Sequence, residues 1–479
     1  MNQKEIILVN PFHKISGGNE GAVGPPLGLM YIASLLEQDG HSVGIVDGKV
    51  NRFNVTQTIK AIQRESSKPL LIGLYIYSFN QKVCKELILN LRQVFPDAVI
   101  VAGGPIPTSI PERVLDDISL DYLVRGEGEF ALRDLVRKLK GNVRQPIRDI
   151  PGVIPGDKSV PFDTKTARIT NLDDLPFPAY HLLGDIKRYS SSSRGMPFAA
   201  MITSRGCQYN CDFCSKDVFE NSVARRSVLN VISEIDELIK RYGIKQVDFV
   251  DDNLANSRNC FEMFLDEILM RNYKIWFNVP SGVRADILDK KLLNKMRKAN
   301  FYSLAFGIET ADQDLLNMHN KSLNIDLMES KIAIAKSCGF FVYGFFIIGL
   351  PGETEGSFRK TLAFIKKTRI DMANFMIAIP FPGSKMMETV KENGKLLVDI
   401  ESGIDEGFYG GKCFFSYPGL NPNDVIRRYK IAYRSFFSFK KILKLLFQCR
   451  GALEYRWLIA NGLSVVKNIF KTKNNSNNI

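Results

Sequence analysis

The chain has 479 residues, of which 45% are hydrophobic and 24% are charged, a balance typical of a globular protein with about two to four domains. It contains no apolar run of about 18 residues, which argues against a membrane-spanning helix. The first residues lead directly into an apolar segment rather than a targeting peptide, so we expect a cytoplasmic protein.

Residues 1–140 alternate between strand-like and helix-like segments. Apolar runs predict five strands, over residues 6–9, 43–46, 70–76, 99–102 and 122–124. Amphipathic stretches predict three helices, over residues 27–38, 81–94 and 130–139. This βαβ rhythm indicates a doubly wound, Rossmann- or flavodoxin-like parallel sheet, with a ligand beyond the carboxyl ends of its strands. Gly103 and Gly104 follow one of these ends, where backbone without side chains lets a ligand come close.

The proline-rich residues 141–195 predict a linker, and the βα rhythm resumes over residues 196–400. Six strands are predicted, over residues 198–203, 246–251, 274–279, 303–309, 341–348 and 374–379. Six helices are predicted, over residues 228–241, 260–270, 290–298, 326–338, 357–367 and 384–393. Six parallel βα units form a partial (β/α)6 barrel of the TIM type, whose chemistry belongs at the carboxyl ends of the strands.

The most informative motif follows the first strand of this barrel. Cys207, Cys211 and Cys214 lie within one short loop, so their thiolates can be aimed at one point. Iron–sulfur clusters usually take four thiolates, so three would leave one iron open to another ligand. A structural zinc needs four protein ligands, and no further pair of ligands lies nearby. A disulfide framework is disfavoured because eight cysteines in 479 residues are few.

The spacing Cys-x3-Cys-x2-Cys, with Phe213 just before the last cysteine, resembles the radical S-adenosylmethionine (SAM) superfamily. The resemblance implies a [4Fe-4S] cluster whose open iron binds SAM, and an external electron donor of the flavodoxin or ferredoxin type. In that family, reductive cleavage of SAM gives a 5′-deoxyadenosyl radical that removes hydrogen from unactivated carbon. Phe213 either lines the SAM pocket or packs in the core.

The same resemblance implies SAM contacts at the ends of later strands. Asp251 or Asp252 would hold the SAM amino group, although either would also serve as a helix N-cap. Arg284 suits the SAM carboxylate, and Glu309 suits a ribose hydroxyl. Gly349, in the glycine-rich stretch that closes the fifth strand, would let the backbone approach the adenine.

A second resemblance covers residues 1–140. Its motifs, in chain order, are Pro25-Pro26-Leu27-Gly28-Leu29, Gly40-His41, Asp47, Gly103-Gly104 and Arg125-Gly126-Glu127-Gly128-Glu129. In this order, and directly upstream of the cysteines, they resemble the cobalamin (B12)-binding domain that precedes some radical SAM cores. The resemblance implies that Gly103 and Gly104 contact a bound cobalamin.

His13 departs from one known cobalamin motif. Mutase-type domains carry Asp-x-His-x-x-Gly, whose histidine ligates cobalt, and the equivalent stretch here is Pro11-Phe12-His13-Lys14-Ile15-Ser16. The aspartate that would orient the histidine is missing. We therefore expect His13 to be a loop residue, and cobalt's lower face to be open or to bind water.

Together the resemblances imply a cobalamin-dependent radical SAM enzyme similar to class B methyltransferases, which transfers a methyl group from methylcobalamin to an unactivated carbon. No Ser/His/Asp arrangement is needed, and no side chain is assigned as catalytic. Three alternatives remain open. The first is a radical cyclase or oxidase with the same cofactors. The second is a methylthiotransferase acting on RNA, although only Cys84 precedes Cys207 to hold another cluster. The third is a non-catalytic cobalamin-binding sensor.

Residues 401–479 lie outside both resemblances and form a basic extension. They hold 13 Lys and Arg against five Asp and Glu, which accounts for +8 of the net charge of +13. Residues 424–447 predict one amphipathic helix with a basic face. We expect this helix to pack on the protein, with peripheral contact to an anionic membrane as the alternative. A nucleic-acid partner is not expected because the charge is local, and the extension favours a small or amphiphilic substrate. The tail, residues 473–479, should be disordered.

Overall fold

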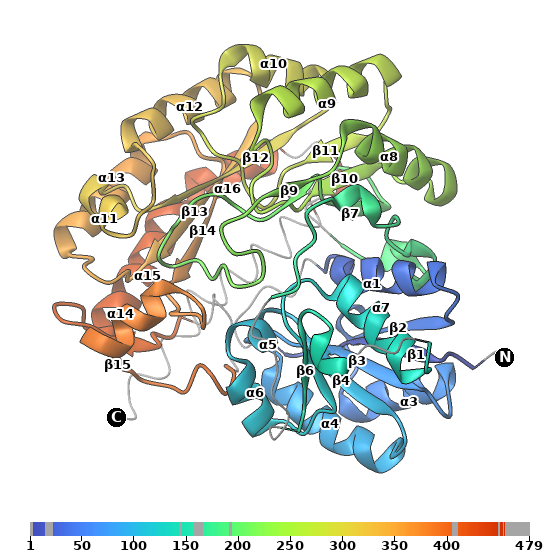
Figure 1. The fold of residues 1–479 in the computed structure, drawn as a ribbon. Helices are drawn as coiled ribbons and strands as arrows, with labels where there is room; N and C mark the ends of the chain where they lie inside the picture. Colours follow the sequence, from blue (N-terminus) through green and yellow to red (C-terminus); the bar gives the residue numbers. More distant parts are fainter. Residues whose placement is uncertain are drawn as a thin grey trace.

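The structure is a computed structural model that describes residues 3–14, 23–142, 146–157, 166–190, 194–404, 411–448, 451–453 and 455. Two halves each centre on parallel strands and lie against each other, and helices flank the strands of both (Figure 1). The tail at residues 473–479 lies outside the described residues, so its predicted disorder remains a prediction.

The N-terminal half contains a six-stranded sheet in the order β2-β1-β3-β4-β5-β6. Its strands are β1 (Ile6–Asn10), β2 (Val43–Asp47), β3 (Leu71–Tyr75), β4 (Val99–Gly103), β5 (Tyr122–Val124) and β6 (Val153–Pro155). The first five strands are parallel, and β6 is antiparallel to β5. Because β6 lies within the predicted linker, the sheet extends beyond residue 140. Its three residues form too short an apolar run to be recognised in the sequence.

Helices cover both faces of this sheet, which explains why its strands are continuously apolar. One face packs on α1 (Leu27–Gln38) and α7 (Gly128–Leu139), and the other on α3 (Val55–Glu65) and α4 (Gln81–Val94). Three shorter helices complete this half: α2 (Gly48–Asn51), α5 (Pro105–Ser109) and α6 (Pro111–Asp117). Within the described part of residues 142–190 the chain forms four 3-10 helices. The first, η1 (Ile147–Asp149), precedes β6, and η2 (Leu172–Asp174), η3 (Tyr180–Leu183) and η4 (Ile186–Arg188) lie between β6 and the second half.

The second half contains six parallel strands in chain order. They are β7 (Phe198–Met201), β10 (Gln246–Phe249), β11 (Trp276–Asn278), β12 (Ser303–Glu309), β13 (Phe341–Ile348) and β14 (Met372–Ile377). Three of them pair as β7-β10-β11 and three as β12-β13-β14, and a parallel bridge between Phe277 and Phe301 joins the two sets. The predicted open barrel of six βα units is therefore confirmed.

Helices lie on the outside of this barrel (Figure 1). They are α8 (Val228–Tyr242), α9 (Arg258–Arg271), α10 (Lys290–Lys298), α11 (Gln313–Met318), α12 (Ile325–Ser337), α13 (Glu355–Lys367) and α14 (Lys385–Asn393). Four short strands form two antiparallel pairs, β8 (Ser204–Arg205) with β9 (Ala224–Arg225) and β15 (Lys395–Leu396) with β16 (Phe415–Ser416). The β8–β9 pair closes the base of the loop that carries the three cysteines.

The C-terminal extension forms two helices where the sequence predicted one. They are α15 (Pro422–Phe436) and α16 (Phe439–Gln448). The chain turns at Phe437, and the Ser438 hydroxyl accepts a hydrogen bond from the Lys441 N–H in the first turn of α16. Helix α15 buries Tyr429 and Tyr433 in the barrel core, which confirms the expected packing for that helix. Among the described residues, no helix is long and apolar enough to cross a membrane.

Candidate active site

The three cysteines line one cavity of about 490 Å³ at the carboxyl ends of the barrel strands. Cys207 and Cys211 are partly buried, and all three thiols are free of disulfide bonds. The loop starts at Gly206, whose φ of +85° is a left-handed conformation. A Cβ at this position would lie 2.1 Å from the Ser222 carbonyl, so only glycine lets the loop close on itself here. Cys214 is the most exposed of the three.

The two aspartates after β10 have different surroundings. Asp251 is buried and accepts hydrogen bonds from the backbone N–H and the hydroxyl of both Thr203 and Ser204, at 2.6–3.1 Å. Asp252 accepts one from the Gly206 N–H at 2.8 Å and lines the cysteine cavity. The structure therefore makes Asp251 a support for the strand before the cysteines, because its carboxylate is already occupied. Asp252 is the one of the two that faces the cysteine cavity.

Arg284 and Glu309 line the same cavity, as their places at strand ends predicted. The Arg284 guanidinium lies 3.6 Å from the centre of the Tyr209 ring, pairs with Asp286 at 3.1 Å, and donates to the Ser322 carbonyl. Glu309 accepts a hydrogen bond from Lys321 at 2.9 Å. Lys321 was not predicted, because it follows α11 rather than a strand, and no local motif marks it.

Phe213 and Gly349 had both been assigned to the SAM pocket, and the structure separates them. Phe213 lines the cysteine cavity. Gly349 is not among the residues that line it, and its N–H donates to the Glu353 carboxylate at 3.0 Å. A Cβ on Gly349 would lie 2.5 Å from Val425 of α15. Helix packing therefore accounts for the glycine, and its approach to an adenine stays a prediction.

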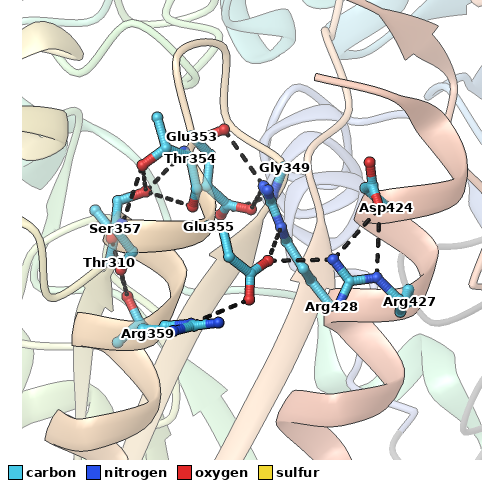
Figure 2. Close-up of polar contacts among 11 residues, drawn as sticks. Thr310, Gly349, Glu353, Thr354, Glu355, Ser357, Arg359, Asp424, Arg427 and Arg428 are labelled. Atoms are coloured by element: carbon cyan, nitrogen blue, oxygen red, sulfur yellow. Dashed lines mark hydrogen bonds and ion pairs between the residues drawn. The ribbon is translucent and has the colours of Figure 1, made fainter. Parts of the chain in front are cut away.

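A polar network fastens α15 to the turn after β13 (Figure 2). Arg428 pairs with Glu353 at 3.0 Å and with Glu355 at 3.5 Å. Arg428 and Glu353 are both buried. On the outer side, Arg427 pairs with Glu355 and Asp424 at 3.1 and 3.3 Å. The C-terminal extension is thereby tied to a turn at the end of a barrel strand.

Arg428→Met should lower the free energy of unfolding by about 3–5 kcal/mol, because it leaves the Glu353 carboxylate buried without its cation. Arg427→Met removes a neighbouring arginine whose side chain is 49% exposed, so a loss of less than about 1 kcal/mol is expected. Urea unfolding of both variants measures the difference. Equal losses would contradict a special role for the buried pair.

A second cavity, of about 330 Å³, lies where the N-terminal sheet meets the barrel. Gly103 and Gly104 line it, as predicted, together with Gly28 and Tyr75. A Cβ on Gly28 would meet no atom within 4 Å, so this glycine borders open space. Asp252 and Phe219 line both cavities, so the two cavities adjoin.

His13 is not among the residues that line the second cavity. Its Nδ1 lies 2.9 Å from the Tyr77 hydroxyl, and its ring stacks against Phe79. Burial lowers the pKa of His13 to about 4, so the ring is neutral at pH 7. The position of His13 outside this cavity agrees with the expectation that it is a loop residue. Ile15 and Ser16 of the same motif lie outside the described residues.

Buried charges join the two halves beside the second cavity. Arg205, two residues before Cys207, pairs with Glu127 at 2.8 Å and Glu129 at 2.6 Å, and all three side chains are buried. Arg168 also pairs with Glu127, at 2.6 Å. Glu127 and Glu129 belong to a motif in the sequence, but nothing local reveals their partner, which lies 78 and 76 residues away in the chain.

Both halves match known families. Residues 14–136 match the B12 binding domain family, and residues 201–365 match the Radical SAM superfamily. An uncharacterised methyltransferase of Pyrococcus horikoshii is 31% identical to this chain over 82% of its length and 84% of that protein. The cytidylyl-2-hydroxyethylphosphonate methyltransferase of Streptomyces wedmorensis is 28% identical, over 87% of this chain and 86% of that protein. The anaerobic magnesium-protoporphyrin IX monomethyl ester cyclase of Rubrivivax gelatinosus is 26% identical, over 92% of this chain and 79% of that protein.

Solved structures share the whole fold. The radical S-adenosylmethionine methyltransferase TsrM from Kitasatospora setae, with cobalamin and a [4Fe-4S] cluster bound, superposes with a TM-score of 0.72 at 16% identity, over 97% of this chain and 99% of that one. The cobalamin-dependent SAM radical enzyme OxsB, with aqua-cobalamin and SAM bound, superposes with a TM-score of 0.74 at 17% identity, over 98% of this chain and 72% of that one. These likenesses show the fold.

Proposed function

Because the chain belongs to the family of cobalamin-dependent radical SAM methyltransferases, we propose that it transfers a methyl group to an unactivated carbon of a small, amphiphilic molecule. The observation that carries this proposal is the shared wall of the two cavities. Asp252 and Phe219 border the cysteine cavity on one side and the glycine-lined cavity on the other. A substrate at this wall is within reach of groups bound in both.

The residues present fit the cofactors of the family. Three thiols face one cavity beside Asp252 and Arg284, which suits a three-cysteine [4Fe-4S] cluster and the amino and carboxylate groups of SAM. The glycine-lined cavity has open space where a Cβ at Gly28 would stand, which suits a cobalamin. When bound, SAM at the cluster supplies a radical that removes hydrogen from the substrate, and cobalamin supplies the methyl group.

The chain's own side chains bind and orient these groups. The Gly206–Asp252 hydrogen bond and the closely bonded Asp251 fix the loop that presents the thiols. Glu309 and Lys321 place a charged pair in the wall of the cysteine cavity. Apolar residues complete the lining of the cysteine cavity and keep water from a reactive intermediate; among them are Phe345, Ile347, Met376 and Ile379.

Product mass tests the proposal. Reconstituted protein, incubated without oxygen with SAM, cobalamin, a reductant and extracts of candidate small molecules, should form 5′-deoxyadenosine together with a product one methylene heavier than its precursor. Formation of 5′-deoxyadenosine with a product of unchanged mass, or one lacking two hydrogens, would contradict methyl transfer and favour the cyclase or oxidase alternative, which the 26% identity to a cyclase keeps in view.

The RNA methylthiotransferase alternative has no support in the N-terminal half. Such a reaction needs further cysteines upstream of Cys207, and the sequence holds only Cys84 there. Cys84 is buried in the sheet core on α4, where it cannot hold an accessible cluster. The sensor alternative requires no SAM cleavage, so the 5′-deoxyadenosine measurement decides it as well.

We infer a cytoplasmic site of action, because a reducing compartment suits an oxygen-sensitive cluster, and an external electron donor of the flavodoxin or ferredoxin type. We also infer peripheral membrane contact through α16. Ile442, Leu443 and Phe447 are exposed on this helix, beside the exposed Lys444. An apolar face next to lysine suits an anionic bilayer.

Flotation with vesicles tests the membrane contact. The protein should float with phosphatidylglycerol vesicles and not with phosphatidylcholine vesicles. Phe447→Glu should abolish flotation, since Phe447 is 86% exposed and makes the largest apolar contribution. Val94→Glu, on the remote helix α4, serves as the control. Flotation that survives Phe447→Glu would exclude α16 as the contact.

A further inference from the structure

One turn is fastened to the cysteine loop and brings one of its own residues, Lys321, to the wall of the cysteine cavity. It consists of His319, Asn320 and Lys321, between α11 and α12. The His319 carbonyl accepts from the Asp212 N–H at 3.0 Å, and the Asn320 side chain donates to the Asp212 carboxylate at 2.7 Å. Asp212 lies between Cys211 and Cys214, so the turn is fastened to the cysteine loop itself. The His319 ring adds a contact of 2.8 Å between Nε2 and the Pro351 carbonyl.

This anchored turn holds a cation at the cavity. Lys321 lines the cavity with all three cysteines, and its side chain is 15% exposed. Its ammonium lies 2.9 Å from Glu309 and 5.7 Å from the centre of the Phe213 ring. Phe213, whose ring the ammonium approaches, lies between Cys211 and Cys214 in the cysteine loop. Lys321 therefore places a positive charge next to the loop that carries the three sulfurs.

The backbone is distorted around this pair. Glu309 has a φ of +62°, which is uncommon for a residue with a side chain. A Cβ on neighbouring Gly307 would lie 2.7 Å from the Glu309 carboxylate and 3.2 Å from the Lys321 ammonium. Backbone strain of this kind persists where the surrounding structure enforces it, and it concentrates at functional sites. The lysine is thus placed at the cavity by several independent contacts.

Resting on the proposed function, we propose that Lys321 sets the reduction potential of the cluster held by the three cysteines. Reduction transfers one electron from an external low-potential donor to the cluster, with no bond formed or broken and no proton moved. Three thiolates make the site anionic, and the added electron increases that negative charge. A cation held in a buried wall stabilises the reduced form more than the oxidised form, because the low dielectric there strengthens the attraction.

Lys321→Met should make the cluster harder to reduce. At a fixed solution potential, the ratio of reduced to oxidised cluster should fall about tenfold, which corresponds to about 59 mV for a one-electron couple. Electron paramagnetic resonance during a redox titration, without SAM or substrate, measures this ratio. Lys321→Arg keeps the charge and should restore the ratio. Lys331→Met, on α12 and not among the residues that line the cavity, is the control for loss of one positive charge.

Glu309 separates the effect of the lysine from that of its partner. In Lys321→Met/Glu309→Gln both charges are lost, and the ratio should be higher than that of Lys321→Met, because the carboxylate left unpaired by the single substitution is gone as well. An unchanged ratio in Lys321→Met, or an equal fall in Lys331→Met, would overturn the proposal. So would failure of Lys321→Met to assemble a cluster that Lys321→Arg assembles, since that would make the lysine structural. Failure of the wild-type chain to assemble any cluster would instead refute the proposed function.

Discussion

Cys211→Ala should abolish both the cluster and the cleavage of SAM. Cys211 lines the cavity between Cys207 and Cys214, and removing its thiol leaves two sulfurs for a cluster that is normally held by more. The reconstituted variant should therefore lack the broad absorbance near ~400 nm that iron–sulfur clusters give, and it should form no 5′-deoxyadenosine. Iron and sulfide analysis, with the absorbance spectrum, measures the first effect.

Cys260→Ala is the matched control for this variant. Cys260 is exposed on α9 and is not among the residues that line the cysteine cavity. The Cys260→Ala variant should keep the wild-type iron content and activity. Turnover by Cys211→Ala at a rate near that of Cys260→Ala would refute the assignment of the cysteine loop.

Arg205→Met should destabilise the whole chain and weaken cobalamin binding. It leaves Glu127 and Glu129 buried at the domain contact without their shared cation, a loss of about 3–5 kcal/mol for a buried pair. All three residues line the glycine-lined cavity. Glu127 keeps its pair with Arg168, but Glu129 loses the cation that lies 2.6 Å from it, and this carboxylate should also reduce retention of cobalamin. Urea unfolding and the spectrum of cobalamin that remains after gel filtration measure the two effects.

The destabilisation by Arg205→Met should depend on pH. Burial raises the pKa of Glu127 above its ordinary 4.5 even with Arg205 present, whose charge opposes the shift. Loss of Arg205 raises that pKa further. A carboxyl group whose pKa is higher in the folded than in the unfolded protein stabilises the folded state at low pH. This stabilisation is lost as the pH rises through the folded-state pKa. The deficit should therefore be smaller at pH 5.5 than at pH 8. The control is Arg133→Met, which removes a partly exposed pair with Asp134 and should lower the free energy of unfolding by less than about 1 kcal/mol at both pH values. If the loss of stability in Arg205→Met grew as the pH fell, the pairing of Arg205 with Glu127 and Glu129 would be contradicted.

The sequence predicted those elements whose boundaries are marked locally. Helix α10 has the predicted limits, since Asp289 caps its first turn. Helix α3 was missed even though Asn54 and Gln57 form a capping box before it. The predicted helix over residues 424–447 was wrong in its continuity, because neither glycine nor proline marks the turn at Phe437.

The candidate site was predictable to the extent that it follows strand ends. Parallel strands bring their carboxyl ends to one edge, and this rule placed Asp252, Arg284 and Glu309 beside the cysteines. The same rule predicted that Gly349 approaches an adenine, and the structure shows this glycine packed against Val425. Lys321 and Arg205 were missed, because each acquires its role from tertiary partners that no local motif reveals.

The central claim is that three cysteines hold a cluster with one iron open to SAM. Electron paramagnetic resonance of the reduced, anaerobically reconstituted chain, recorded before and after SAM is added, tests it most directly. We expect about four irons per chain and a cluster signal whose g-values change when SAM binds. A chain that carries no iron, or a signal that SAM leaves unchanged, would contradict the claim.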